Sequence, residues 1–274
     1  MSSPDAALPA WGAPFGESRR DDLRRSAPLG RLDRDWAFGD ASGRGVTVAI
    51  VDSGVEGEHP AVAGSLRRSV RVELSGGDAI VVADEAVDVV GHGTACASIV
   101  HNLAPAAELI SVRVLGPDNR GKGAAFAAGL EWAIDEGVDV INLSLSSRSE
   151  AMFAVFHDLA DRAYFGGSLL VCAANNVPVA SYPSLFSAVV SVAAHDVRDP
   201  ATWFYNPNPP VEFGAFGLDV DVAWKDGGRI VATGNSFAAP HIAGYAARIR
   251  AAHPAATPFE IKTILAATAN VPQA

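Results

Sequence analysis

The sequence has little cysteine and no long hydrophobic run. Its two cysteines, Cys96 and Cys172, stand in apolar surroundings without paired spacing, which predicts reduced thiols rather than a disulfide framework. No stretch of roughly eighteen apolar residues is present, and the first residues lack the basic start and apolar core of a signal peptide. We therefore expect a cytoplasmic protein that has no membrane partner.

Basic residues are also fewer than acidic residues. Asp and Glu number 31 against 21 Lys and Arg, so the formal net charge is −10 at pH 7. A surface of this sign repels a phosphate backbone, and nucleic acid is not an expected partner. With 49% apolar residues over 274 positions, the chain can bury the core of one large domain.

An N-terminal extension is predicted to precede one regular domain. Residues 1–28 mix proline, glycine, alanine and clustered charges without a sustained period, which is typical of a mobile arm. In residues 29–274, strand-like and helix-like stretches alternate, which predicts an α/β fold with a mostly parallel sheet and helices on both faces. The predicted strands are 46–54, 109–115, 138–145, 168–174 and 188–195, with a hairpin at 69–84, and the predicted helices are 124–137, about 150–164, one from Ser236 and one after Thr257.

Three polar residues stand where chemistry could take place. Asp52 ends the first predicted strand, at the carboxyl edge where open α/β sheets bind ligands, although aspartate there is also a common turn former. His92 lies between two glycines, so its ring can approach a neighbour without crowding. Ser236 precedes a helix, where serine is a frequent N-cap. Each residue alone has a purely structural alternative.

Taken together, the motifs VAIVDSG, GHGT and GNSFAAPHIAG resemble the subtilisin-like serine proteases. The order Asp, His, Ser differs from α/β-hydrolases, in which serine comes first, and from the chymotrypsin type, in which histidine does. The resemblance extends from about residue 30 to 270 and implies a three-layer fold. It further implies an endopeptidase in which Ser236 attacks the peptide carbonyl, His92 transfers the proton and Asp52 orients the imidazole.

The resemblance also implies an oxyanion hole. Asn176, in the segment CAANNVP, aligns with the family's donor asparagine, and its amide would act together with the N–H of Ser236. The alternative is that Asn175 or Asn176 only shapes a turn. Asn235 replaces the family's usual threonine before the serine, and we expect its amide to assist the oxyanion.

Departures from the family pattern predict a restricted specificity. Added side chains at positions that are usually glycine reduce the volume of the primary pocket, so we expect a small residue on the acyl side of the cleaved bond, or else a blocked site. Ser146, Asn175 and Ser181 stand at those positions. The full set of predicted substrate-binding residues is Ser144, Leu145, Ser146, Asn175 and Ser181.

Neither a cofactor nor a tight calcium site is expected. The segment SIVHNLAP leaves no room for the family's calcium loop, and Ala61 stands where the family has an acidic ligand. Cys96 falls four residues after His92, on the same helix face, and resembles the free cysteine of the proteinase K and thermitase branch. A mercurial bound to Cys96 is expected to displace His92 and inhibit.

Several functions stay open. The first is an endopeptidase that acts on peptides or proteins, either for general turnover or to process a peptide precursor. The others are a catalytically impaired binding protein on the same fold and a peptide macrocyclase. Residues 7–15, ALPAWGAPF, are apolar enough to lie in a substrate groove, so the extension is expected to be inhibitory. The oligomeric state is left open.

Overall fold

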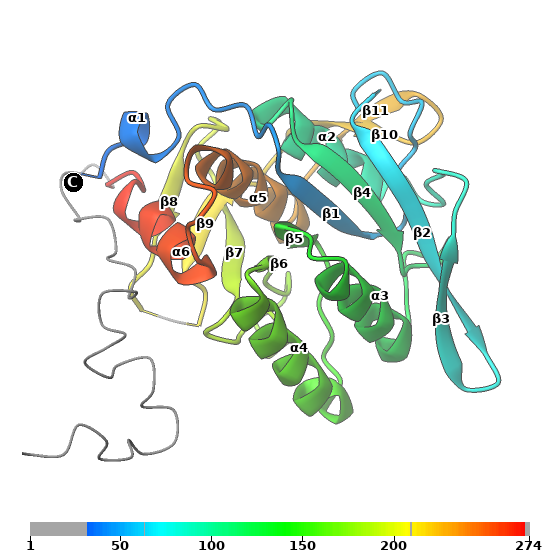
Figure 1. The fold of residues 1–274 in the computed structure, drawn as a ribbon. Coiled ribbons are helices and arrows are strands. Elements are labelled where there is room, and N and C mark those ends of the chain that lie inside the picture. Colours follow the sequence, from blue (N-terminus) through cyan, green and yellow to red (C-terminus); the bar gives the residue numbers. More distant parts are fainter. Residues whose placement is uncertain (1–31, 63, 209, 272–274) are drawn as a thin grey trace, which may run out of the picture. The chain divides into compact units, whose positions relative to one another are not determined.

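The computed structural model describes residues 32–62, 64–208 and 210–271. Residues 1–28, predicted as an inhibitory extension, lie outside the described residues. Residues Asp33–Ala274 belong to one compact unit, and its described part has three layers, with a central sheet between two sets of helices (Figure 1). The α/β prediction is confirmed.

Nine strands form the main sheet, in the order β3-β2-β4-β1-β5-β6-β7-β9-β8. The interior strands run parallel, and the edge strands β3 and β8 are antiparallel to their neighbours. A separate two-stranded ribbon pairs β10 with β11. The strands are β1 (Thr47–Asp52), β2 (Leu66–Ser75), β3 (Asp78–Ala83), β4 (Glu108–Arg113), β5 (Val140–Leu143), β6 (Leu169–Ala173), β7 (Val190–His195), β8 (Trp203–Tyr205), β9 (Phe213–Phe216), β10 (Val220–Trp224) and β11 (Gly228–Ala232).

Strand β1 is buried on both faces because helices cover both sides of the sheet. Its side chains alternate between the two cores, as the pleat requires: Val48 and Ile50 pack towards α2 and α5, whereas Ala49 and Val51 pack towards α3 and α4. The helices are α1 (Arg34–Ala37), α2 (His92–Leu103), α3 (Gly123–Asp135), α4 (Phe153–Gly166), α5 (Asn235–Ala252) and α6 (Pro258–Ala267).

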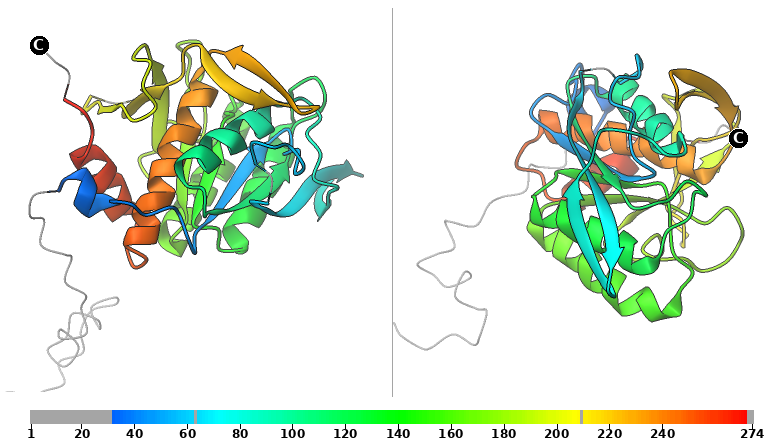
Figure 2. Two further views of the ribbon diagram at one scale, coloured as in Figure 1. Left: turned by 90° about the horizontal axis from the view of Figure 1, so that it is seen from above. Right: turned by 90° about the vertical axis from the view of Figure 1, so that its right-hand side faces the viewer.

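The β10–β11 ribbon covers the first turns of α2 and α5, and the turned views show it across these two helices (Figure 2). Val220 and Val222 of β10 form a small core with Ala95 and Ile99 of α2 and Phe237 of α5. The ribbon therefore supports the ends of the two helices that carry His92 and Ser236.

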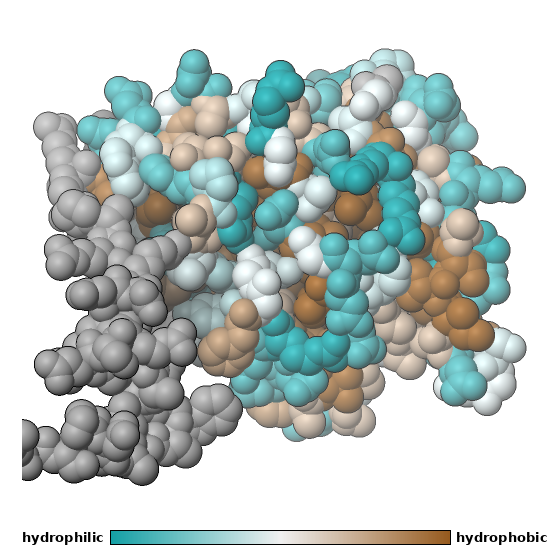
Figure 3. Space-filling view, in the orientation of Figure 1, coloured by the Kyte–Doolittle hydropathy of each residue, from teal (hydrophilic) through white to brown (hydrophobic). Residues whose placement is uncertain are grey.

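The predicted hairpin is confirmed as β2 and β3, which pair antiparallel. Hydrophobic residues gather on the surface where these two strands lie (Figure 3), including the exposed Leu74 and Ile80. None of the helices in the described part of the chain is both long and apolar enough to span a bilayer.

We predict opposite stability changes for two glycine-to-alanine substitutions in helices. A β-carbon on Gly129 of α3 would lie 2.4 Å from Val114 Cγ1, whereas one on Gly166 at the end of α4 would meet nothing within 4 Å. Gly129→Ala should lower the free energy of unfolding by about 1–3 kcal/mol through overpacking. Gly166→Ala should raise it by up to about 1 kcal/mol, because alanine favours the helix. Denaturant unfolding measures both, and equal changes would contradict the packing assigned to α3.

Candidate active site

Asp52 and His92 meet where the end of β1 faces the start of α2. The Nδ1 atom of His92 lies 2.8 Å from Asp52 Oδ1 and 2.9 Å from Oδ2. Asp52 is fully buried and His92 nearly so, and Asp52 Oδ1 also accepts the backbone N–H of Ser53 at 2.7 Å. A bond from Nδ1 to a carboxylate leaves Nε2 as the ring nitrogen available to a substrate or nucleophile.

Asp88 fixes the same junction and was not predicted from the sequence. Its Oδ1 accepts the Ser53 hydroxyl at 2.8 Å and the backbone N–H groups of Val90 and Gly91. Its Oδ2 accepts both the backbone N–H and the hydroxyl of Thr94. The N-cap, Gly91, has no side chain to satisfy these donors, so Asp88 supplies the acceptor and the negative charge that a helix N-terminus favours. An acidic residue just before a predicted helix start was the available signal.

The pKa of His92 is raised above its usual value. Burial by itself would lower it, but the charge of Asp52, the hydrogen bond to Asp52 and the charge of Asp88 outweigh burial. The protonated form of the His92 ring is therefore stabilised. A general base needs this property because it holds the proton it has accepted until a later step of the reaction.

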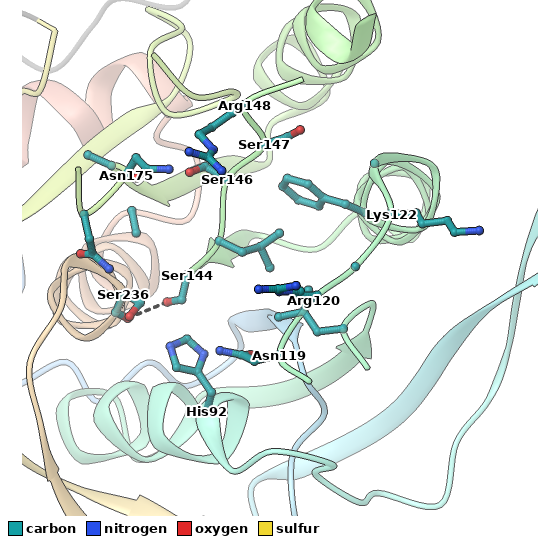
Figure 4. Close-up of a pocket in the computed structure, with 18 residues that line it drawn as sticks. His92, Asn119, Arg120, Lys122, Ser144, Ser146, Ser147, Arg148, Asn175 and Ser236 are labelled. Atoms are coloured by element: carbon teal, nitrogen blue, oxygen red, sulfur yellow. Dashed lines mark hydrogen bonds between the residues drawn. The ribbon is translucent and has the colours of Figure 1, made fainter. Parts of the chain in front are cut away.

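Ser236 lies in the first turn of α5, but it does not cap the helix as predicted. The N-cap is Gly234, and no side chain caps this end. The Ser236 hydroxyl makes no hydrogen bond to any described residue, and Ser236 lines the same cavity as His92 (Figure 4). No hydrogen bond joins its Oγ to His92 in this structure, a separation that is common in the absence of substrate.

Pro240 explains how the backbone of Ser236 is held. In an α-helix the carbonyl of Ser236 would accept the N–H of residue 240, and proline has none. Instead, the Ser144 hydroxyl donates to this carbonyl at 2.7 Å, and Cys96 Sγ lies 3.6 Å from it. Asn142 Nδ2 in turn donates to Ser144 Oγ. Ser144, predicted as a substrate-binding residue, therefore also positions the first turn of α5.

Asn176 is oriented by the backbone beside Ser236. The N–H of Asn235 donates to Asn176 Oδ1 at 2.9 Å, which leaves Asn176 Nδ2 free of described partners. A β-carbon built on Gly234 would lie 3.7 Å from Asn176 Nδ2 and 3.3 Å from Ser236 Oγ. The amide donor and the hydroxyl therefore flank the same small space.

The expectation for Asn235 as a donor to an oxyanion is wrong. Its Nδ2 donates to the carbonyls of Ala174 and Asn175, at 3.1 and 3.2 Å, and its Oδ1 accepts the N–H of Ala194 at 2.8 Å. Both amide protons are thus directed away from Ser236. Asn235 instead ties the loop after β6, which carries Asn176, to the start of α5.

His92, Asn176 and Ser236 line a cavity of about 540 Å³. Four predicted substrate-binding residues line it, namely Ser144, Leu145, Ser146 and Asn175. Ser181 is not among the lining residues; it is buried, and its hydroxyl lies 3.0 Å from that of Ser184. Three basic residues that were not predicted from the sequence also line the cavity, namely Arg120, Lys122 and Arg148. They were missed because nothing in the sequence placed their loops beside His92.

Both cysteines are free and buried, as predicted. Burial raises the pKa of each thiol, which keeps both in the thiol form. One ligand atom each of Asp52, His92 and Cys96 lie within 4.8 Å of one another, so an atom bound to Cys96 would reach the Asp52–His92 pair. The segment 104–107 between α2 and β4 contains only alanine and proline and offers calcium no side-chain oxygen.

A buried carboxylate–imidazole pair beside a free serine at a helix N-terminus defines a serine hydrolase site. A sequence profile described as the subtilase family matches residues 43–274. The chain therefore belongs to the subtilase family.

Individual relatives agree with this assignment. Subtilisin BL of Lederbergia lenta is 32% identical over 241 residues, which cover 84% of this chain and 85% of the relative. The thermostable alkaline protease of Halalkalibacterium halodurans is 31% identical over 240 residues, covering 83% of this chain and 63% of the relative.

Among solved structures, a cold-adapted subtilisin-like serine proteinase has a TM-score of 0.69 at 26% identity, covering 89% of this chain and 87% of that one. The S41 psychrophilic protease has a TM-score of 0.71 at 28% identity, covering 82% and 83%. The three-layer subtilisin-like fold that the motifs implied is confirmed.

We predict that activity rises with pH through a midpoint above about 6.5, the usual pKa of histidine. His92 accepts a proton only when neutral, and its raised pKa moves that condition to higher pH. Asp88→Asn keeps an acceptor oxygen but removes a charge that favours the protonated ring, so the midpoint should fall by about half a unit to one unit. The pH dependence of kcat/KM for a peptide substrate measures it.

The matched control is Asp78→Asn at the exposed start of β3, which changes the net charge equally but lies away from His92. Its midpoint should stay at the parent value. Equal shifts in the two variants would show that Asp88 has no specific influence on His92.

Proposed function

We propose that this chain hydrolyses peptide bonds with Ser236 as nucleophile, His92 as general base and then general acid, and Asp52 as the group that orients the imidazole. The observation that supports this most directly is the buried hydrogen bond between Asp52 and His92, because His92 lines the same cavity as Ser236, whose hydroxyl has no described partner. Asp52 fixes the tautomer in which Nε2 can accept the Ser236 proton. The same ring nitrogen then returns the proton to the leaving amine.

Asn176 is proposed as the side-chain donor to the oxyanion. Its Oδ1 is held by the Asn235 N–H, so the amide cannot turn without losing that bond. Its Nδ2 is thereby set on the Ser236 side, where charge develops on the carbonyl oxygen. The N–H groups of the first turn of α5 and their dipole add to this stabilisation.

A serine-directed fluorophosphonate tests the nucleophile. The intact mass of the protein should gain one adduct, and Ser236→Ala should gain none. Asn176→Ala should still react but lose about a hundred- to a thousandfold in kcat, a magnitude measured on subtilisin itself. Asn175→Ala removes a neighbouring amide and should lose much less. An unmodified parent protein would favour the binding-protein alternative.

The acyl-side pocket is proposed to accept small residues. Ser146 and Asn175 line the cavity, and their side chains occupy volume that glycine would leave open. Ser181 is packed against Ser184 behind it and adds no polar group to the lining. A narrow pocket favours a restricted substrate, such as a peptide precursor, over general protein turnover.

A peptide library that varies the residue before the cleaved bond tests this pocket. We expect alanine, glycine and serine to be favoured over phenylalanine and leucine by at least about tenfold in kcat/KM, because a large side chain would have to displace Ser146 or Asn175. Efficient cleavage after phenylalanine or leucine would contradict a small pocket.

A further inference from the structure

Three basic side chains lie around the cavity that contains Ser236. Arg120 and Lys122 come from the loop between β4 and α3, and Arg148 comes from the segment after β5, on the other wall (Figure 4). The guanidinium of Arg120 points into the cavity, whereas the ammonium of Lys122 points away from it. All three are exposed. The cavity is thus bordered by positive charge on two sides, beyond the His92–Ser236 end.

These cations have no acidic partner in the described ranges of the chain. Within those ranges no aspartate or glutamate lines the cavity, and no carboxylate pairs with Arg120, Lys122 or Arg148. Asp118, the acidic residue nearest in sequence to Arg120, accepts its backbone N–H rather than its guanidinium. The charges are therefore available to a ligand.

Other basic residues of the described surface do have acidic partners. Arg67, Arg162 and Arg229 each pair with a carboxylate on the surface. The whole chain carries a net charge of −10, so its average field repels acidic peptides. At the cavity, cations without an acidic partner among the described residues reverse that sign locally, and a cleft lined by one sign of charge concentrates ligands of the other sign.

We propose that the substrate is a peptide with acidic side chains on the acyl side of the cleaved bond, which pair with Arg120 and Arg148. This proposal rests on the proposed peptidase function. The acyl side is assigned because the cations share one cavity with Ser144, Leu145 and Ser146, the residues predicted to bind that side. Arginine can grip a carboxylate with two N–H groups, whereas lysine acts as a point charge.

Three peptides that differ only in the residue placed at two matched positions test the charge preference. Their acyl-side sequence is Xaa-Ala-Xaa-Ala before the cleaved bond, with Xaa as glutamate, its uncharged isostere glutamine, or lysine. We expect kcat/KM for the glutamate peptide to exceed that for the glutamine peptide by about tenfold at low salt, since each exposed pair contributes only a few-fold. The lysine peptide should be poorest, and about 1 M NaCl should reduce the differences.

Matched variants locate the effect. In Arg120→Gln and in Arg148→Gln, the ratio of glutamate to glutamine kcat/KM should fall towards one. Lys225→Gln removes an exposed cation in the β10–β11 turn, outside the cavity lining, and should keep the parent ratio. If Lys225→Gln lowers the ratio as much as the cavity variants do, the preference reflects net charge and the proposed pairing is wrong.

Failure of this proposal is distinguishable from failure of peptidase activity. If the glutamate and glutamine peptides are cleaved equally well, the acidic preference is overturned and the peptidase function stands. If no peptide is cleaved and no fluorophosphonate adduct forms, fluorescence anisotropy of the labelled peptides on Ser236→Ala still measures the preference. Tighter binding of the glutamate peptide would support an acidic ligand, and equal binding would reject it.

Discussion

The close contact between the end of β1 and the first turn of α2 determines the geometry of the whole site. A β-carbon on Gly93 would lie 2.0 Å from the carbonyl oxygen of Gly54, so only glycine allows the helix to approach this closely. Gly93 also donates its N–H to the Ser53 hydroxyl. With the two backbones in contact, Asp52 on the strand and His92 on the helix are near enough for a direct hydrogen bond, and no water can enter between them.

A second set of polar contacts fixes the start of α5, and each of them joins a side chain to a backbone N–H or carbonyl group. Pro240 frees the Ser236 carbonyl for Ser144, the N–H of Asn235 holds Asn176, and the Asn235 side chain binds the loop from Ala174. Each contact crosses between α5 and a strand end of the sheet. Ser236 is therefore positioned by its backbone while its hydroxyl stays unbonded, as a nucleophile requires.

The sequence was informative where a local pattern corresponds to a local structure. Buried strands such as β1, the β2–β3 hairpin and the Thr257 cap of α6, whose capping box with Glu260 is present, all follow from residues close together in the chain. Strands β8 to β11 contain only three to five residues each. They were missed because, unlike the equally short β5 and β6, they stand in segments interrupted by glycine, proline and charged residues, which show no apolar run or period. They are stabilised by partners and cores that the sequence does not place.

The same distinction explains the outcome for the site residues. The motifs identified Asp52, His92 and Ser236, which the structure brings to one edge of the sheet, but not the partners of Asn235. A side-chain amide can donate in several directions, and its direction depends on carbonyls supplied by another segment. Asp88 and the three cavity cations were missed for the same reason, since their importance comes from which segments the fold places beside them.

The distribution of charge around His92 explains how a site with two carboxylates can present a positive field to a ligand. The oxygens of Asp52 are directed at His92 and the Ser53 N–H, and those of Asp88 accept five hydrogen bonds from Ser53 and the start of α2. Both carboxylates lie on the side of His92 away from the cavity. From there their negative charge stabilises the imidazolium. The open side is bordered by Arg120, Lys122 and Arg148. One fold can therefore raise the pKa of its base with negative charge and still attract an acidic substrate.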